Sequence, residues 1–205
     1  MSKAVILADG SFPVHQVPLE VLNNAEVIVC CDGSASALTA HGLTPSAIVG
    51  DMDSISPELK NRFADRIFID TGQETNDLTK AVEWSVNAGF NDLEILGAGG
   101  KREDHTIGNI SLLAEYARIA KVRMITDSGV FIPMLKSGDI ESQPGQQVSI
   151  FSIDPVTEIT SSGLVYPLLK RKLTNWWQGT LNEAEGNRFD LRFESGTLII
   201  FLKFL

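Results

Sequence analysis

Two carboxylates one residue apart, Asp51 and Asp53, follow the short apolar run Ala47–Val49. If that run is a buried strand, both acids lie at its carboxyl end, where open α/β sheets bind their ligands. Carboxylate oxygens suit Mg²⁺, which takes one or two protein carboxylates together with substrate phosphates. The spacing therefore predicts a site for a metal-bound nucleotide. The alternative is an ordinary turn, because Asp and Ser cap turns and helices and Ser54–Glu58 resembles a helix start.

A third acid, Asp77, lies in the first turn of a predicted helix. It is a candidate third magnesium ligand, or a base that takes the proton of an alcohol. The simpler interpretation is that Asp77 stabilises the helix dipole while Thr75 or Asn76 caps the helix. Lys80, one turn further along, either meets a phosphate or is an ordinary exposed helix lysine.

A glycine-rich turn, Gly97–Gly100, separates another apolar run from a helix. The backbone amides of such a turn can approach a phosphate, and neighbouring cations can stabilise the charge that gathers during phosphoryl transfer. The polar residues that follow the turn are Lys101, Arg102, Asp104, His105 and Asn109. The pattern lacks the Gly-Lys-Ser/Thr ending of a P-loop, and His105 is equally well explained as a hydrogen-bonded histidine at a helix start.

Short apolar runs alternate with amphipathic stretches from residue 3 to about 126, which is typical of a parallel sheet flanked by helices. The predicted strands are Ala4–Ala8, Glu26–Cys31, Ala47–Val49, Arg66–Ile69, Leu93–Leu96 and Val122–Thr126. The predicted helices are Ser34–His41, Asn76–Ala88 and His105–Ala120. Asp or Gly follows each of the first five strands, so we expect a common polar rim at one edge of a Rossmann-like α/β sheet.

Beyond residue 128 the pattern changes to short β-type runs separated by Gly, Pro, Ser and Asn turns. These runs are 130–132, 148–151, 189–193 and 197–201, and no convincing helix lies between them. We therefore predict an α/β catalytic domain over residues 1–128 and a small all-β sandwich over 129–205.

The composition narrows the function further. A formal net charge of −9 argues against nucleic acid or an anionic membrane as a partner. The two cysteines, Cys30 and Cys31, are adjacent, and we expect buried thiols in a reducing compartment. The run Ala4–Ala8 is too short for a signal peptide, and no apolar segment is long enough to span a bilayer, so we expect a cytoplasmic protein.

Several motifs, taken together and in order, resemble those of the thiamine pyrophosphokinase family. They are Asp32-Gly33, Gly50–Ser54, Gln73–Lys80, Gly97–Asn109, Gly163–Leu168 and Asn182-Glu183. The resemblance covers nearly the whole chain. It implies transfer of a pyrophosphoryl group from ATP to the hydroxyl of thiamine, with Mg²⁺, giving thiamine diphosphate and AMP. It also implies a homodimer with active sites at the subunit interface, between the α/β domain of one subunit and the sandwich of its partner.

The resemblance also assigns roles to residues. The metal and phosphate acids correspond to Asp51, Asp53 and Asp77, the nucleotide-side acid to Asp32, and the Arg-x-Asp pair to Arg102 and Asp104. The remaining residues expected on the nucleotide side are Gly33, Gln73, Asn76, Lys80, Lys101, His105 and Asn109.

Two positions depart from the family pattern: Asn76 replaces the usual Thr, and Leu181 replaces the usual Ser. The second change removes a hydroxyl from the expected thiamine pocket and leaves Thr180, Asn182 or the backbone to take its place. Trp176 and Trp177 could stack on the thiamine rings or serve as core or interface residues, and only Trp177 is included among the predicted ligand contacts.

Two alternatives remain open from the sequence. One is a diphosphokinase for another small alcohol, such as a pterin, which the Leu181 departure suggests. The other is a nucleotide-binding sensor without catalysis, against which the full set of carboxylates argues.

Overall fold

The computed structural model describes residues 2–205, which divide into two compact units. The first unit holds the chain up to Leu112 together with Ile119–Asp127, and the second holds Leu113–Arg118 together with Ser128–Leu205. Among the described residues, no helix is both long and apolar enough to cross a membrane.

The first unit is built on a parallel sheet. Its strands are β1 (Lys3–Leu7), β2 (Ile28–Cys31), β3 (Ala47–Gly50), β4 (Ile67–Ile69), β5 (Asp92–Leu96) and β6 (Lys121–Ile125). They pair in the order β4-β3-β2-β1-β5-β6, and every pair is parallel. Strands β2 and β3 are buried along their whole length, which explains why they are continuous apolar runs. The predicted α/β class with a Rossmann-like sheet is confirmed.

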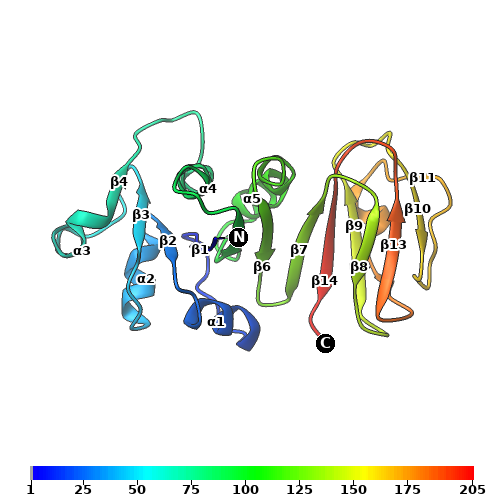
Figure 1. Cartoon of the computed structure of the whole chain (residues 1–205), viewed down its shortest axis with the longest axis horizontal. Coiled ribbons are helices and arrows are strands. Elements are labelled where there is room, and N and C mark those ends of the chain that lie inside the picture. Colours follow the sequence, from blue (N-terminus) through cyan, green and yellow to red (C-terminus); the bar gives the residue numbers. More distant parts are fainter. Residues whose placement is uncertain (1) are drawn as a thin grey trace. The chain divides into compact units, whose positions relative to one another are not determined.

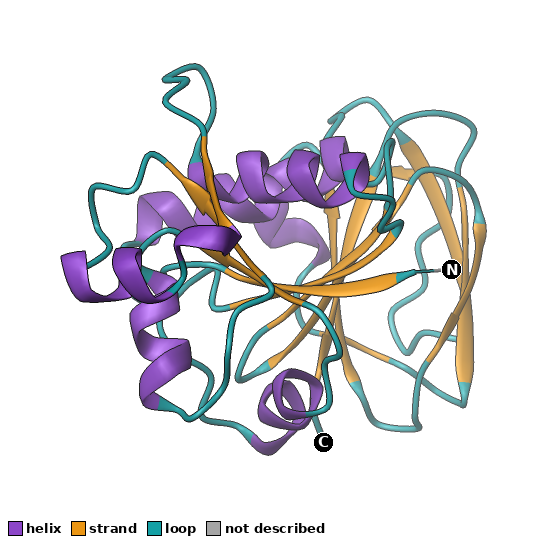
Figure 2. Cartoon of the chain, turned by 60° about the vertical axis from the view of Figure 1, so that its left-hand side comes forward, coloured by secondary structure: helices purple, strands orange, loops and turns teal. Residues whose placement is uncertain are grey.

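Helices cover both faces of this sheet (Figures 1 and 2). They are α1 (Gln16–Asn23), α2 (Ser34–Ala40), α3 (Pro57–Arg62), the 3-10 turn η1 (Ala64–Arg66), α4 (Asp77–Asn87) and α5 (Glu103–Tyr116). In Figure 1, α4 and the first part of α5 lie on one side of the strands, and α1 and α2 lie on the other. The parallel crossovers therefore place helices on both faces, as this sheet type requires.

Helix α1 is an element that the sequence did not predict. Pro18 reads as a helix breaker, but it occupies the first turn, where the missing N–H would have no partner within the helix in any case. The side chain of His15 caps the helix by accepting a hydrogen bond from the N–H of Val17. Helix α5 also differs from its prediction, because it begins at Glu103 and ends at Tyr116 rather than spanning His105–Ala120.

The order of the strands creates a switch point beside β1. The chain runs outward from β1 through β2, β3 and β4, then returns to pair β5 with the opposite edge of β1. Chains that leave the carboxyl ends of β1 and β5 therefore diverge to opposite faces, and a crevice opens between them. This topology marks the carboxyl ends of β1 and β5 as the place to look for a ligand.

The second unit consists of antiparallel strands. They are β7 (Gly129–Met134), β8 (Gly138–Glu141), β9 (Gln147–Ser152), β10 (Glu158–Ser162), β11 (Arg171–Lys172), β12 (Asn182–Glu183), β13 (Arg188–Arg192) and β14 (Leu198–Lys203), with a 3-10 turn η2 (Trp176–Gly179). One sheet has the order β7-β14-β9-β12 and the other β11-β10-β13-β8. A shared apolar core, which includes Ile150, Phe189 and Ile200, joins them, so the predicted all-β sandwich is confirmed.

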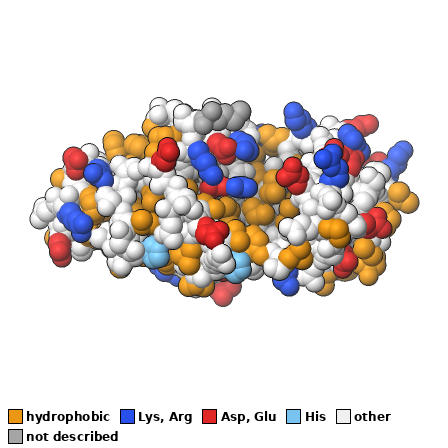
Figure 3. All heavy atoms as spheres, turned by 60° about the horizontal axis from the view of Figure 1, so that its bottom comes forward, with side chains coloured by type: hydrophobic (Ala, Val, Ile, Leu, Met, Phe, Trp, Pro, Cys, Tyr) orange, Lys and Arg blue, Asp and Glu red, His pale blue; other side chains and the backbone are white. Residues whose placement is uncertain are grey.

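Strand β5 of the first unit carries a buried carboxylate, Glu94. The side chain of Glu94 is 1% exposed, and its oxygens meet Lys3 of β1 at 2.7 Å and Arg123 of β6, whose Nε lies 2.7 Å away. Figure 3 shows basic side chains gathered around acidic ones on one face of the molecule. A buried charge is tolerated only when it is paired, so these two cations are what allows an acid at this position.

We expect the double substitution Lys3→Met with Arg123→Met to destabilise the protein by about 3 kcal/mol, because it leaves Glu94 buried and unpaired. Adding Glu94→Leu should recover most of that loss. The measurement is the urea denaturation midpoint. Lys121→Met, which breaks the exposed pair with Asp92, is the control and should cost less than about 1 kcal/mol. A double variant no less stable than this control would contradict the interpretation.

Candidate functional site

Three carboxylates meet at the carboxyl ends of β2 and β3. Asp32 follows β2, and Asp51 and Asp53 follow β3. The N–H of Asp32 donates to the carbonyl of Val49 at 3.0 Å, which extends the pairing of the two strands as far as the acids. Carboxylate oxygens of all three residues lie within 4.8 Å of one another, a spacing that suits a single divalent cation.

Asp32 is the most constrained of these acids. It is 3% exposed, and its backbone has a left-handed φ of 31°, an uncommon conformation for a residue other than glycine. Its Oδ2 accepts a hydrogen bond from the N–H of Ser54 at 3.1 Å, whereas its Oδ1 is buried without a hydrogen-bond partner among the described residues. Burial, followed by the charges of Asp77, Asp51 and Asp53, raises the pKa of Asp32. A cation bound beside Oδ1 would supply the missing partner.

Asp51 and Asp53 influence each other's ionisation. The neighbouring carboxyl of Asp53 lowers the pKa of Asp51, and that of Asp51 raises the pKa of Asp53. The N–H of Asp53 donates to Oδ1 of Asp51 at 3.3 Å. A divalent cation bound between the two carboxylates would offset their repulsion.

Asp77 lies beside this group but outside the set of three. The structure places β4 next to β3, and a Cβ built on Gly50 would lie 3.5 Å from the carboxyl carbon of Asp77 and 3.0 Å from Cβ of Asp32. A side chain at Gly50 would therefore crowd Asp32 and contact Asp77. The predicted metal set of Asp51, Asp53 and Asp77 stays a prediction, and the structure adds Asp32 as a candidate ligand.

Helix α4 contributes a cation and a cap. The interpretation of Lys80 as an exposed helix lysine is wrong: Lys80 is buried, and its Nζ lies 3.2 Å from Oδ1 of Asp77. Asn76, rather than Thr75, caps the helix by accepting from the N–H of Thr79 at 2.9 Å. The amide of Asn76 also donates to Oδ1 of Asn109 at 3.1 Å, which ties the start of α4 to α5.

Each cation that follows the glycine turn is held by its own carboxylate. Arg102 donates to Asp104 through Nε at 3.1 Å and through an η nitrogen at 2.5 Å, and this hydrogen bonding lowers the pKa of Asp104 to about 2. Lys101 lies 3.0 Å from Oδ1 of Asp9 at the end of β1. The pair of Arg102 and Asp104 therefore stays ionised throughout the physiological pH range.

These segments enclose a cavity of about 330 Å³ at the switch point between β1 and β5. Its polar and charged lining comes from four segments: the end of β1, the start of α4, the residues after the glycine turn, and α5. These residues include Asp9, Asn76, Asp77, Lys101, Arg102, His105 and Asn109. Asn109 also donates from Nδ2 to the carbonyl of Ala98 at 2.9 Å and so fixes the turn. The cavity thus gathers charged groups of both signs around a space at the lower end of the range for small-ligand sites.

Four predicted nucleotide-side residues lie outside the lining of this cavity: Asp32, Gly33, Gln73 and Lys80. Gln73 is exposed and donates weakly, at 3.4 Å, to the carbonyl of Thr71. Gly33 lies on the Asp32 side, where an added Cβ would stand 3.0 Å from Oδ2 of Asp9 and 3.2 Å from Cβ of Ser54. A side chain at Gly33 would therefore crowd Asp9 and Ser54.

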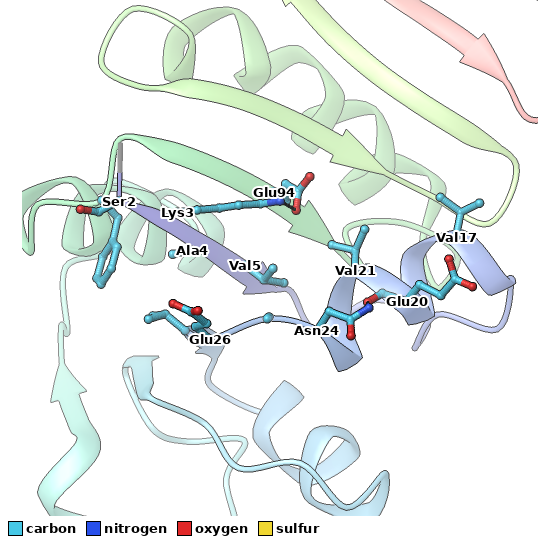
Figure 4. A pocket seen from close by; sticks show the side chains of 13 residues that line it. Ser2, Lys3, Ala4, Val5, Val17, Glu20, Val21, Asn24, Glu26 and Glu94 are labelled. Atoms are coloured by element: carbon cyan, nitrogen blue, oxygen red, sulfur yellow. Dashed lines mark hydrogen bonds and ion pairs between the residues drawn. The ribbon is translucent and has the colours of Figure 1, made fainter.

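A larger cavity of about 820 Å³ lies elsewhere in the first unit (Figure 4). It is bounded by the start of β1, by Val17 and Val21 of α1, and by Glu94. Lys3 reaches Glu94 there, so the carboxylate is already paired. The three clustered acids Asp32, Asp51 and Asp53, which we call the rim acids, do not line this cavity. Its size alone does not make it the reactive site, and we assign the chemistry to the smaller cavity and the rim acids beside it.

The second unit separates the two tryptophans. Trp176 packs on Phe151 with ring centroids 5.5 Å apart and donates from Nε1 to the carbonyl of Ser152, so it is a structural residue. Trp177 is 69% exposed and available to a ligand. Leu181 is exposed too, and its φ of 61° is left-handed.

The two polar residues predicted near Leu181 are engaged within the unit. The amide of Asn182 accepts from the N–H of Tyr166 at 3.1 Å and donates to the carbonyl of Tyr166 at 2.7 Å. The hydroxyl of Thr180 donates to the carbonyl of Trp177 at 2.8 Å. Both side chains therefore shape the backbone around Tyr166 and Trp177.

A comparison with known families decides the affiliation of the chain. A model described as the thiamin pyrophosphokinase catalytic domain matches residues 19–126, and one described as the thiamin pyrophosphokinase substrate-binding domain matches residues 129–201. The chain belongs to the thiamin pyrophosphokinase family.

Individual relatives agree with this family. The chain is 29% identical over 180 residues to a thiamine pyrophosphokinase of Bacillus subtilis, with 82% of each chain covered. It is 32% identical over 195 residues to thiamine pyrophosphokinase 1 of Oryza sativa, which covers 80% of this chain and 73% of the relative.

Solved structures of the thiamin pyrophosphokinase family share the fold. The Bacillus subtilis enzyme superimposes with a TM-score of 0.81 at 23% identity, covering 98% of this chain and 99% of that one. The yeast enzyme gives a TM-score of 0.80 at 16% identity, with 99% and 86% covered.

Asp9 is a cavity residue that reasoning from the sequence missed. The available signal was its position, because Asp9-Gly10 ends β1 in the same way that Asp32-Gly33 ends β2. Its contact with Lys101 depends on the pairing of β1 with β5, which no local pattern reveals.

We expect the affinity for Mn²⁺, used as a probe of the rim acids, to fall about tenfold between pH 7.5 and pH 5. Metal binding requires ionised carboxylates, and the raised pKa values of Asp32 and Asp53 place protons on the site as the pH falls. Titration calorimetry at the two pH values measures the change. Asp53→Asn should bind more weakly at pH 7.5 and vary less with pH. An affinity that is equal at both pH values would show that these acids do not hold the metal.

Proposed function

We propose that this protein transfers a pyrophosphoryl group from ATP to the hydroxyl of thiamine, giving thiamine diphosphate and AMP. The observation that carries the proposal is the meeting of Asp32, Asp51 and Asp53 within 4.8 Å, in a chain that belongs to the thiamin pyrophosphokinase family. Family membership favours thiamine over a pterin as the acceptor, and a catalyst over a sensor.

We assign Mg²⁺ to the rim acids. Asp51 and Asp53, with Asp32 or Asp77 beside them, would hold it, and the unpartnered Oδ1 of Asp32 fits such a role. When bound, Mg²⁺ neutralises phosphate charge and orients the phosphates for displacement. A site made only of carboxylate oxygens suits this hard cation.

The cations would stabilise the charge that gathers on the phosphates. Arg102 keeps its orientation through Asp104, Lys80 is fixed by Asp77, and Lys101 reaches the cavity from the glycine turn. The other residues assigned to the nucleotide side are Gly33, Gln73, Asn76, His105 and Asn109. Because phosphoryl transfer needs positioning and charge stabilisation more than covalent catalysis, such pre-oriented groups supply most of the acceleration.

The acceptor hydroxyl would attack the β-phosphorus, and the bond from that phosphorus to the oxygen of AMP would break. Either Asp53 or Asp77 would take the hydroxyl proton. We assign the thiamine contacts to the predicted domain 129–205, where Trp177 offers an exposed ring and Thr180 and Asn182 shape the adjacent backbone. The ATP and metal contacts belong to residues 1–128.

The test is AMP release from ATP and Mg²⁺, with and without thiamine, in the wild type and in Asp51→Asn. We expect thiamine-dependent AMP that falls at least about a hundredfold in the variant, because a ligand of the metal is lost. Glu158→Gln, which alters an exposed residue of the sandwich, is the control and should retain full activity. ATP binding without AMP release in the presence of thiamine would overturn the choice of acceptor.

We also propose that the protein is a homodimer. Large apolar side chains of the second unit stay exposed in the single chain: Tyr166, Leu169, Trp177 and Leu181. We propose that these side chains lie in the contact between subunits, where exposed apolar surface would be covered. Sedimentation velocity should give twice the mass of the chain, and Leu169→Asp should shift the protein toward the monomer. A wild-type protein that sediments as a monomer at micromolar concentration would contradict the dimer.

We place the reaction in the cytoplasm. The buried thiols of Cys30 and Cys31 are free, and burial raises the pKa of Cys30 to about 12. Unpaired thiols of this kind are typical of reducing compartments.

A further inference from the structure

Two backbone segments, Gly10–Ser11 and Gly97–Gly100, are joined by hydrogen bonds beside the cavity, and we call this contact the seam. The N–H of Gly10 donates to the carbonyl of Gly97 at 2.7 Å, and the N–H of Ser11 donates to the carbonyl of Gly99 at 2.8 Å. A Cβ on Gly10 would lie 2.2 Å from the oxygen of Gly97, and a Cβ on Gly100 would lie 2.5 Å from Oγ of Ser11. Close backbone contact therefore requires glycine at Gly10, while Gly100 has a left-handed φ of 89° and lies against the Ser11 side chain.

Asp9 and Lys101 project from the two sides of this seam. Asp9 belongs to the β1 side and Lys101 follows the glycine turn on the β5 side, and their charged atoms lie 3.0 Å apart. Both residues line the cavity. The side chains are 49% and 57% exposed respectively, so the pair is open to solvent and to a ligand.

A half-exposed ion pair contributes little to stability. It does restrict the lysine, whose long side chain otherwise samples many rotamers. An ammonium group has three N–H donors, and the carboxylate of Asp9 occupies one of them. The remaining donors stay available to phosphate oxygens in the cavity.

We propose that Asp9 is a positioning residue, which holds the Lys101 ammonium at the cavity mouth so that it meets the phosphates of ATP. The inference rests on the proposed function, because it assumes that ATP is the ligand of this cavity. Asp9 acts through Lys101 and not through the metal. The same relation exists next to it, where Asp104 holds Arg102.

The test is a double-mutant cycle with Asp9→Ala, Lys101→Met and the combined variant. Two quantities are measured: kcat/KM for ATP in AMP release, and the dissociation constant of ATP with Mg²⁺ by calorimetry. We expect Asp9→Ala to weaken both about tenfold, which is the cost of immobilising a freed lysine side chain. The combined variant should match Lys101→Met alone, because Asp9 has no effect once its lysine is gone.

Two further variants sharpen the result. Asp9→Glu keeps the carboxylate and should restore most of the affinity. Glu158→Ala breaks a similarly exposed pair with Lys172 in the second unit and should change neither quantity.

Losses from Asp9→Ala and Lys101→Met that multiply in the combined variant would overturn the inference and indicate an independent role of Asp9, such as metal binding. An unchanged affinity in Asp9→Ala would also overturn it. If the wild type binds ATP but releases no AMP with thiamine, the proposed function fails, while the binding cycle still decides the role of Asp9.

Discussion

Repulsion between carboxylates is the constraint on which the rest of the site depends. Asp32, Asp51 and Asp53 bring their oxygens within 4.8 Å of one another, and Asp77 stands beside them. Like charges at this distance disfavour each other's ionisation. Burial, and then the charges of its neighbours, raise the pKa of Asp32, and the neighbouring carboxyl of Asp51 raises that of Asp53. The fold must therefore hold the acids together against their own charge.

The backbone of the sheet does most of this holding. The N–H of Asp32 is bonded to the carbonyl of Val49, and the N–H of Ser54 is bonded to Asp32, so the two loops are tied by hydrogen bonds that do not depend on the ionisation of their neighbours. Gly50 leaves room for the acids, and the buried ammonium of Lys80 offsets part of their charge. Left-handed backbone at Asp32 and Met52 is the conformational cost of this arrangement.

Much of the fold was predictable because parallel sheets place the carboxyl ends of their strands at one edge. Asp or Gly after each of five apolar runs was enough to locate the rim. The extent of α4 was predicted to within one residue at each end, whereas the choice of Asn76 over Thr75 as its cap came from the structure. Helix α1 was not predictable by pattern, since Pro18 conceals it, and the polar strand β10 lacks the β-type composition of its neighbours. Within the site, the grouping of Asp32 with Asp51 and Asp53, and the burial of Lys80, depend on side-chain directions set by tertiary packing.

The pairing of β1 with β5 has a consequence for how the protein folds. Lys3 pairs with Asp92 and Leu7 with Leu96, so the chain must close a long loop, with β2, β3 and β4 inside it, before these strands meet. Contacts of such high sequence separation form slowly. The seam at Gly10 and Gly97 can exist only after that closure, which makes the cavity one of the last features of the first unit to appear. A nucleotide that binds there would therefore select completed molecules and draw the folding equilibrium toward them.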